Sequence, residues 1–263
     1  MLTTLKRQLP ANKEGFTELH EAAGNGDMKA ARKLLKASKG SVNQVTTQEG
    51  ATPLHLACYR GNAAMAELLL KAGTSTECVT TGGCTPLLYA SKQGNAEVVR
   101  LLLDKGAATD SALSDGDTPL FIACQQGHTE VAQMLLDKGA AIDSALSDGV
   151  TPLFIACYSG HSAMARWLLD SGASVNASLD DGTAPLHEAC LKGFLEIALS
   201  LLERGAMIDQ SKKDGTTAVN AAANQGHLAV VKMLVKAGAS FDTAAADKAH
   251  LEGRTRVANP SAS

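Results

Sequence analysis

The sequence predicts an all-α repeat fold, a solenoid of stacked helix–turn–helix units with β-hairpin turns between them. Three observations predict it. Glycines recur in three series at fixed spacing. The segments between them place apolar residues three and four positions apart, as short amphipathic helices do. A glycine-containing turn signal precedes each pair of such segments. Helices of about eight to ten residues are marginal alone in water, so each pair must pack against its neighbours.

The segment 115–147 shows how one unit begins. Asp115–Gly116 favours a tight turn, because glycine readily takes the positive φ that such turns need. Thr118 is typical of a helix N-cap, since its hydroxyl accepts from an unpaired backbone N–H of the first turn. Pro119 follows at the first helical position, where its missing N–H costs nothing. We therefore expect the first helix of the unit to start at Pro119.

The rest of this unit is predicted to be two short antiparallel helices. Gly127 ends the first helix, as a left-handed residue does, and Gly139 ends the second. Apolar residues form one stripe on each helix: Leu120, Ala123 and Cys124 on the first, and Val131, Leu135 and Leu136 on the second.

The same three glycines recur along the chain. They are the turn glycines Gly15, Gly50, Gly83, Gly116, Gly149, Gly182 and Gly215, the inter-helix glycines Gly26, Gly61, Gly94, Gly127, Gly160, Gly193 and Gly226, and the closing glycines Gly40, Gly73, Gly106, Gly139, Gly172, Gly205 and Gly238. After the first unit each series advances by 33 residues. A fixed period of this size predicts a stacked array rather than one globular core.

A short motif adds a family resemblance to this period. Residues 52–57 read Thr-Pro-Leu-His-Leu-Ala, and with the 33-residue period this resembles the ankyrin repeat. The resemblance covers roughly residues 14–246 and implies an L-shaped repeat whose hairpin turns project from stacked helices. We expect one elongated repeat domain between a polar lead-in, 1–13, and a disordered tail, 247–263. The seven expected repeats are 14–47, 48–80, 81–114, 115–147, 148–180, 181–213 and 214–246.

The first, sixth and seventh repeats depart from the pattern. Glu18 replaces proline in the first, and Ala218 and Asn220 replace proline and histidine in the seventh. Both are expected to be end caps, because a terminal repeat has one face in water. Ala184 replaces the N-cap threonine of the sixth repeat, which weakens that cap by roughly 0.5–2 kcal/mol. We expect Thr183 to replace it in part.

Composition narrows the classes of partner. The net charge is −3 and aromatic residues make up 3% of the chain, which argues against nucleic-acid and membrane-surface partners. The start of the chain lacks the apolar core of a signal peptide, and no run approaches the roughly 18 apolar residues of a membrane helix. We expect an intracellular protein, cytoplasmic or nuclear, that is monomeric and needs no cofactor.

Four cysteines share one repeat position: Cys58, Cys124, Cys157 and Cys190. Equivalent atoms of stacked helices lie about 8–10 Å apart, beyond the roughly 7 Å Cα limit of a disulfide. A zinc site would need four converging ligands. These cysteines are therefore interpreted as small apolar residues that allow close helix packing. Cys78 and Cys84 fall in a turn region, where a local redox pair is the alternative to two unpaired thiols.

Three histidines, His20, His55 and His187, occupy the fourth position of the Thr-Pro-Leu-His motif. We expect each imidazole to bond to nearby backbone and turn groups and to tie one repeat to the next, in preference to binding a ligand. Phe121 and Phe154 hold this position in two repeats, where burial of the ring is worth about 1.5–3 kcal/mol.

Asn43 and Asn176 end two copies of Ser-Val-Asn that follow the closing glycines Gly40 and Gly172. The resemblance implies that an asparagine at this place can be hydroxylated. The other interpretation, which we favour, is a side-chain bond that shapes the turn. Aspartates hold the equivalent place elsewhere, at Asp110, Asp143, Asp209 and Asp242.

The variable positions predict a recognition surface. Repeats 115–147 and 148–180 keep the same framework but differ at the residue after the turn glycine and at the last two residues of the first helix. The family geometry places these positions on the concave face. The exposed, partner-binding candidates are Glu49, Ala51, Tyr59, Arg60, Lys92, Gln93, Asp117, Gln125, Gln126, Val150, Tyr158, Ser159, Thr183, Leu191 and Lys192. Tyr59, Arg60 and Tyr158 are the expected hot spots.

These features predict non-catalytic recognition of a partner protein or peptide by a rigid repeat domain. Pre-organisation favours such binding, because little chain entropy is lost on docking. The alternative is a structural or tethering fragment of a larger protein, such as a ubiquitin-ligase substrate adaptor. An enzyme is not predicted, because no Ser/His/Asp set shares a unit and no glycine-rich phosphate loop is present.

Overall fold

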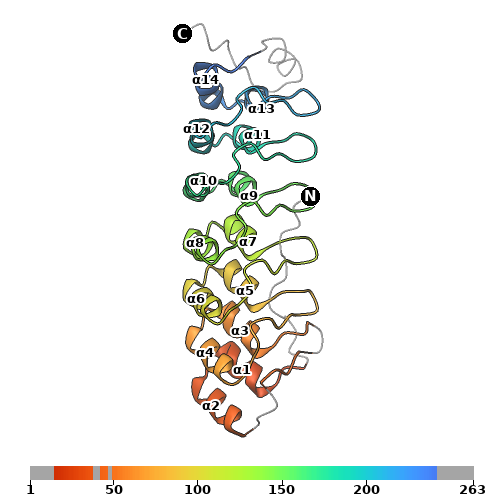
Figure 1. The fold of residues 1–263 in the computed structure, drawn as a ribbon, viewed down its shortest axis with the longest axis vertical. Coiled ribbons are helices and arrows are strands. Elements are labelled where there is room, and N and C mark those ends of the chain that lie inside the picture. The colour runs from red at the N-terminus through yellow and green to blue at the C-terminus, as the bar shows by residue number, and fades with distance from the viewer. Residues whose placement is uncertain (1–14, 38–41, 47–48, 242–263) are drawn as a thin grey trace. The chain divides into compact units, whose positions relative to one another are not determined.

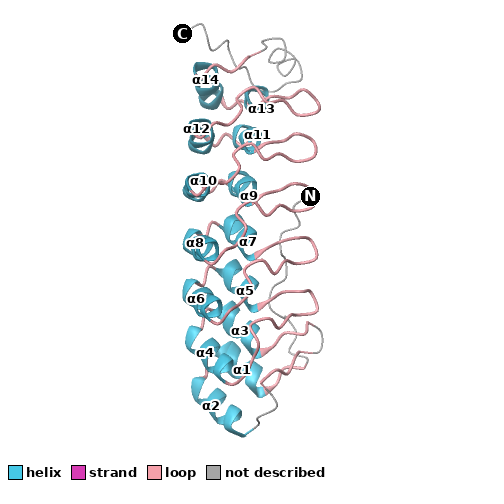
Figure 2. Ribbon diagram, in the orientation of Figure 1, coloured by secondary structure: helices cyan, strands magenta, loops and turns pink. Residues whose placement is uncertain are grey.

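The computed structural model describes residues 15–37, 42–46 and 49–241. These residues form helices that follow one another in pairs, a short helix and then a slightly longer one (Figures 1 and 2). The pairs are α1 (Glu18–Asn25) and α2 (Met28–Ala37), α3 (Pro53–Arg60) and α4 (Ala63–Lys71), α5 (Pro86–Gln93) and α6 (Ala96–Asp104), α7 (Pro119–Gln126) and α8 (Thr129–Asp137), α9 (Pro152–Ser159) and α10 (Ser162–Asp170), α11 (Pro185–Leu191) and α12 (Leu195–Glu203), and α13 (Ala218–Asn224) and α14 (Leu228–Lys236). The all-α repeat prediction is confirmed.

The β-hairpins expected between pairs are present only as turns. The described residues contain no strand, and their one isolated antiparallel bridge joins Ser211 and Thr217 (Figure 2). Two backbone bonds close such a turn. The Leu146 N–H donates to Val150 O and the Gly149 N–H donates to Leu146 O, both at 3.0 Å. Too few ladder bonds form for a strand. The predicted lead-in 1–13, the tail 247–263 and Asp242 lie outside the described residues.

The chain divides into two compact units, Met1–Ala123 with Glu130–Ala141, and Cys124–Thr129 with Ile142–Ser263. In the first unit, α3 packs between α1 and α5, and α4 packs on α6. In the second unit, α11 packs between α9 and α13, and α12 packs between α10 and α14. Within each unit, the first helices thus form one layer and the second helices form another.

Local chemistry sets the start and end of the first helices. In α9, the Thr151 hydroxyl accepts from the Phe154 N–H at 3.2 Å, and Pro152 is the first helical residue. Gly160 ends α9 in the left-handed region at φ 79°. The predicted start of α7 is also confirmed, since Thr118 caps it in the same way and Pro119 begins it.

The inter-helix glycines are needed for a second reason, close approach of the following helix pair. The Asn95 amide sits against Gly61, and a Cβ added there would lie 2.6 Å from Asn95 Oδ1. The Phe194 ring sits against Gly160 in the same way, at 2.8 Å. His227 sits against Gly193. At Gly61, Gly160 and Gly193 a side chain of the following pair therefore packs against bare glycine backbone.

Small residues lie at the centre of the layer of first helices in each unit. The four equivalent cysteines, Cys58, Cys124, Cys157 and Cys190, have no exposed surface. Burial raises the thiol pKa of each, to about 12 at Cys190. Their interpretation as buried apolar residues is confirmed.

Candidate functional site

Buried histidines join consecutive helix pairs of a unit. His55 Nδ1 accepts from the Thr52 N–H at 3.0 Å, so the proton lies on Nε2, which donates to Cys84 O at 3.0 Å. His20 reaches Ala51 O and His187 reaches Gln210 O, both at 2.9 Å. The expected tie between repeats is confirmed at His20 and His55, whereas Gln210 lies in the same repeat as His187, in the connection from α12 to α13. Burial lowers their pKa values, that of His55 to about 4.

The phenylalanines at this position follow the expectation as well. Phe121 is 1% exposed and Phe154 is 3% exposed. Their rings therefore gain buried area where the histidines gain a hydrogen bond.

A second polar link joins successive turns. The Asn176 side chain accepts from the Met207 N–H at 2.9 Å and donates to Gly205 O at 3.2 Å. Asp143 accepts from the Ser174 N–H at 3.0 Å in the equivalent place. The turn-shaping role of Asn176 is therefore confirmed, and its hydroxylation stays a prediction. Asn43 is exposed.

Four turn residues predicted to be exposed are buried. Ala51 is 1% exposed, Val150 2%, Thr183 3% and Asp117 5%, so the expectation of an exposed side chain is wrong for all four. The residue after the turn glycine closes the turn with its carbonyl and lies against the start of the first helix. Glu49, which precedes the turn glycine, is half-buried.

Burial has an electrostatic consequence at Asp117. Its carboxyl loses hydration and lies near a second carboxyl, that of Asp115. Burial, and then repulsion from Asp115, raise the pKa of Asp117 to about 6.

The two residues before each inter-helix glycine, at the end of the first helices, keep accessible surface, as predicted. In the first unit these are Tyr59, Arg60, Lys92 and Gln93, and in the second Gln125, Gln126, Tyr158, Ser159, Leu191 and Lys192. We call each set the first-helix surface of its unit. Two aromatic rings of these surfaces are held in place. Tyr59 meets Tyr89 edge-on with centroids 6.1 Å apart, and Lys192 Nζ lies 4.5 Å from the centre of the Tyr158 ring.

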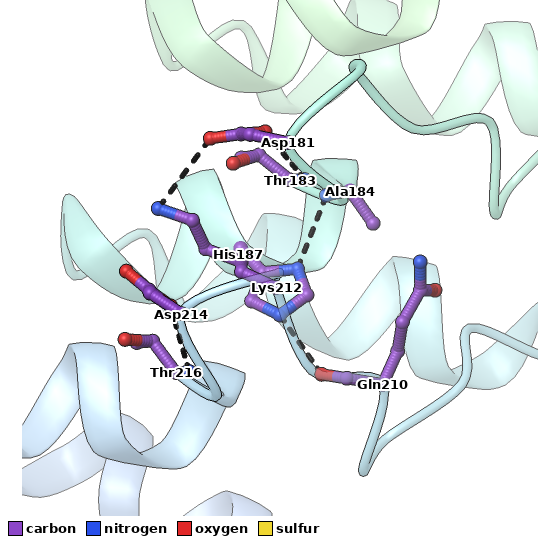
Figure 3. A network of polar contacts seen from close by, with 8 residues as sticks. All are labelled: Asp181, Thr183, Ala184, His187, Gln210, Lys212, Asp214 and Thr216. Atoms are coloured by element: carbon purple, nitrogen blue, oxygen red, sulfur yellow. Dashed lines mark hydrogen bonds and ion pairs between the residues drawn. The ribbon is translucent and has the colours of Figure 1, made fainter.

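The turns beside α11 and α13 carry a polar network (Figure 3). Asp181 accepts from the Thr183 N–H at 2.8 Å, and Asp214 accepts from the Thr216 N–H at 2.8 Å. Lys212 points toward Asp181, with Nζ 3.8 Å from Oδ2. The Thr183 hydroxyl also bonds to Asp181, which lowers the pKa of Asp181.

The start of α11 has no N-cap side chain that accepts a backbone N–H. Ala184 makes no such cap, and the expectation that Thr183 replaces it is wrong, since Thr183 bonds to Asp181. The Ala184 N–H donates instead to His187 Nδ1 at 3.1 Å (Figure 3).

A pocket of about 130 Å³ lies between α11 and α13, beside this network. Sequence reasoning missed it, along with Glu188 in its wall. Leu56, Ile122 and Ile155 hold the equivalent position in other pairs and are each 1% exposed. A carboxylate at a position that is apolar in those pairs was the available signal, although the first pair has the exposed Glu21 there. The pocket residues are Thr183, His187, Glu188, Leu191, Lys212, Thr216, Ala221, Asn224 and Gln225.

The described part of the chain gives little support to a metal site or a cysteine redox pair. No three His, Cys, Asp or Glu side chains gather there as metal ligands. Cys78 and Cys84 are free thiols, and Cys78 Sγ lies 3.5 Å from the Thr52 hydroxyl, so the redox-pair alternative gains no support. None of the described helices has the length and apolar character that crossing a membrane requires.

Comparison with known proteins identifies relatives over most of the chain. The family model for ankyrin repeats in three copies matches residues 19–112, 106–179 and 175–245. The crystal structure of the human ASB11 ankyrin repeat domain superposes with a TM-score of 0.78 and 31% identity, covering 86% of this chain and all 100% of that one. The ankyrin repeat domain of Bcl-3 gives 0.70 and 29%, covering 78% and 93% of the two chains.

Curated sequences give shorter matches. Ankyrin repeat and SOCS box protein 2 of Bos taurus is 36% identical over 77 residues, which is 29% of this chain and 12% of that protein. The chain thus spans only a small part of this relative. The helix pairs, the glycine register and the family match lead to one conclusion: the chain belongs to the ankyrin repeat family.

Proposed function

We propose that the chain is a non-catalytic interaction module that binds a partner protein or peptide on a first-helix surface. The observation that carries this proposal is the contrast within each first helix. Its interior repeats the same small and apolar residues, while the two residues before the inter-helix glycine differ from pair to pair and stay accessible. Ankyrin repeats generally serve protein–protein interaction, which supports the same class of function.

The physical basis is a rigid surface with aromatic anchors. Tyr59 is held by Tyr89 and Tyr158 by Lys192, so docking immobilises few additional side chains. Tyrosine and arginine are enriched among residues that dominate binding energy, which favours Tyr59, Arg60 and Tyr158. The six free thiols fit a reducing compartment, and we place the protein inside the cell.

A selection experiment tests this function. Peptides are selected on the full chain from a random-peptide display library, and their affinities are measured for wild type, Tyr59→Ala and Tyr158→Ala. Leu199→Ala is the matched control, because Leu199 is 40% exposed but lies on the second helix α12. We expect at least one tyrosine variant to bind about tenfold more weakly than wild type, and the control to bind as tightly as wild type. Folded tyrosine variants that bind every selected peptide like the control would contradict the proposal.

A second candidate function is the substrate-binding or tethering part of a larger protein, such as a ubiquitin-ligase substrate adaptor. Its support is the similarity to the ASB11 ankyrin repeat domain and to a protein named for both ankyrin repeats and a SOCS box. Complexes isolated with the tagged protein from its own cells test it. Recovery of ubiquitin-ligase subunits is expected, and their absence from complexes that still contain a bound partner would exclude the adaptor role.

A further inference from the structure

Glu188 stands at a position that is buried and apolar in α3, α7, α9 and α13, whereas α1 has the exposed Glu21 there. Ile155 precedes it by 33 residues in α9 and is 1% exposed. The equivalent residue in α13 is Ala221, whose small side chain leaves space beside the carboxylate. A charged group in such a place costs stability, and local rules of this kind are most often broken where a site needs it.

The resulting pocket joins an anionic wall to apolar surface. Glu188 and His187 come from α11, Leu191 from the end of that helix, and Lys212 and Thr216 from the turn before α13. Leu191 belongs to the first-helix surface of the second unit, so the pocket opens where the partner is proposed to bind.

The carboxylate of Glu188 is not neutralised by a close partner. Its Oε2 is buried and receives no hydrogen bond from any described residue. Burial raises the pKa of Glu188, and the charges of Lys192 and Lys212 offset this only in part.

Both neighbouring cations are held by other groups. Lys212 Nζ lies 3.8 Å from Asp181 Oδ2, and Lys192 Nζ lies 4.5 Å from the centre of the Tyr158 ring. His187 is neutral, because its Nδ1 accepts from Ala184 and its Nε2 donates to Gln210 O. Among the described residues, neither lysine therefore forms a close ion pair with the Glu188 carboxylate.

We propose that this pocket receives one basic side chain, Lys or Arg, from the protein partner. The cationic head pairs with the Glu188 carboxylate, and the alkyl stem lies on Leu191 and Ala221, as long basic side chains commonly pack on apolar surface. This inference rests on the proposed function and adds the chemistry of the bound residue.

Peptides selected on the full wild-type chain provide the probe. Each basic residue of a selected peptide is replaced by citrulline, a neutral isostere of arginine, and binding is compared among wild type, Glu188→Gln and Glu203→Gln. Glu203 is an exposed carboxylate at the end of α12, which makes Glu203→Gln the matched control. Glu188→Gln keeps the shape of the side chain, and its unfolding midpoint verifies that it folds.

The expected result is one peptide position at which citrulline weakens binding to wild type and to Glu203→Gln by about tenfold or more, but leaves binding to Glu188→Gln unchanged. Peptides that require Tyr158 but bind Glu188→Gln as tightly as wild type would overturn this inference and leave the proposed function standing. Selected peptides that depend on neither residue, nor on Tyr59, would overturn both.

Discussion

His55 has no exposed surface, and in α3 its imidazole accepts one backbone hydrogen bond and donates another. Both bonds require the neutral form. Burial lowers its pKa from 6.5 to about 4, so below pH 6.5 the unfolded chain binds the proton more readily than the folded chain. The contribution of His55 to stability is therefore complete above pH 6.5 and is lost as the pH falls toward 4.

The first prediction follows from this loss of stability at acid pH. His55→Phe, which introduces the residue found at Phe121 and Phe154, should remove the part of the acid sensitivity that His55 contributes while keeping the fold. Between pH 7 and pH 5 the free energy of unfolding of wild type should fall by about 2 kcal/mol more than that of the variant. Urea unfolding at the two pH values measures this difference, and parallel pH dependences would refute the assignment.

The buried carboxyl of Asp117 changes stability with pH in the opposite direction. Its folded pKa is raised to about 6 from 3.8, so the folded chain binds this proton more tightly than the unfolded chain. Stability therefore declines as the pH rises from about 4 to 6 and stays lower above that range. Asp117→Asn should stabilise the protein at pH 7 by about 1–3 kcal/mol and have little effect at pH 3.5. Asp137→Asn, at an exposed carboxylate on α8, is the control, and an equal gain from both variants would contradict the burial argument.

Glu188 links stability to binding. Glu188→Ile restores the side chain that Ile155 has in the preceding pair and fills part of the pocket. The free energy of unfolding should rise by about 1–3 kcal/mol, while affinity for peptides with a required basic residue should fall. Chemical denaturation and peptide titration of the same sample measure both. A destabilised variant would mean that Glu188 is itself part of the folding framework.

At the scale of elements, the inter-helix glycine Gly193 meets two constraints, a positive φ and the close approach of a side chain from the next pair. Substitutions can separate the two. Gly193 has φ 75°, and a Cβ there would lie 2.6 Å from His227 Nδ1. Gly205 has φ 87° but no atom within 4 Å of such a Cβ. Gly205→Ala therefore measures the backbone cost alone, about 1–2 kcal/mol.

Gly193→Ala should cost about 1 kcal/mol or more beyond that, because His227 must move and its 3.1 Å bond to Leu191 O is disturbed. Thermal or urea unfolding of the two variants provides the comparison. Replacing His227 by alanine should remove the difference, and equal losses in Gly193→Ala and Gly205→Ala would show that close approach is unimportant.

The helix pairs were predictable from sequence because their ends depend on local chemistry. Thr118, Pro119 and Gly127 act within one turn of chain, so their roles can be inferred without knowing the neighbours. The exposure of Val150 could not be inferred in this way, since the packing of the turn decides it. The Glu188 pocket was missed for a related reason, because its space depends on Ala221, 33 residues away.

At the scale of the molecule, both units are built by the same rule. A helix pair of about 20 residues buries too little surface to be stable alone, and hydrogen bonds and packing from the next pair complete it. Asn176 bonding to Met207 and His227 bonding to Leu191 are such links in the second unit. Destabilising one pair should therefore weaken the pairs beside it.

Native-state hydrogen exchange of the full chain carrying Leu201→Ala tests this dependence most directly. Leu201 is fully buried in α12, which packs between α10 and α14, and its truncation should cost about 2–5 kcal/mol. The predicted result is a loss of amide protection in α10 and α14 as well as in α11 and α12, with no such loss in the exposed control Leu199→Ala. Protection lost only in α11 and α12 would contradict the account.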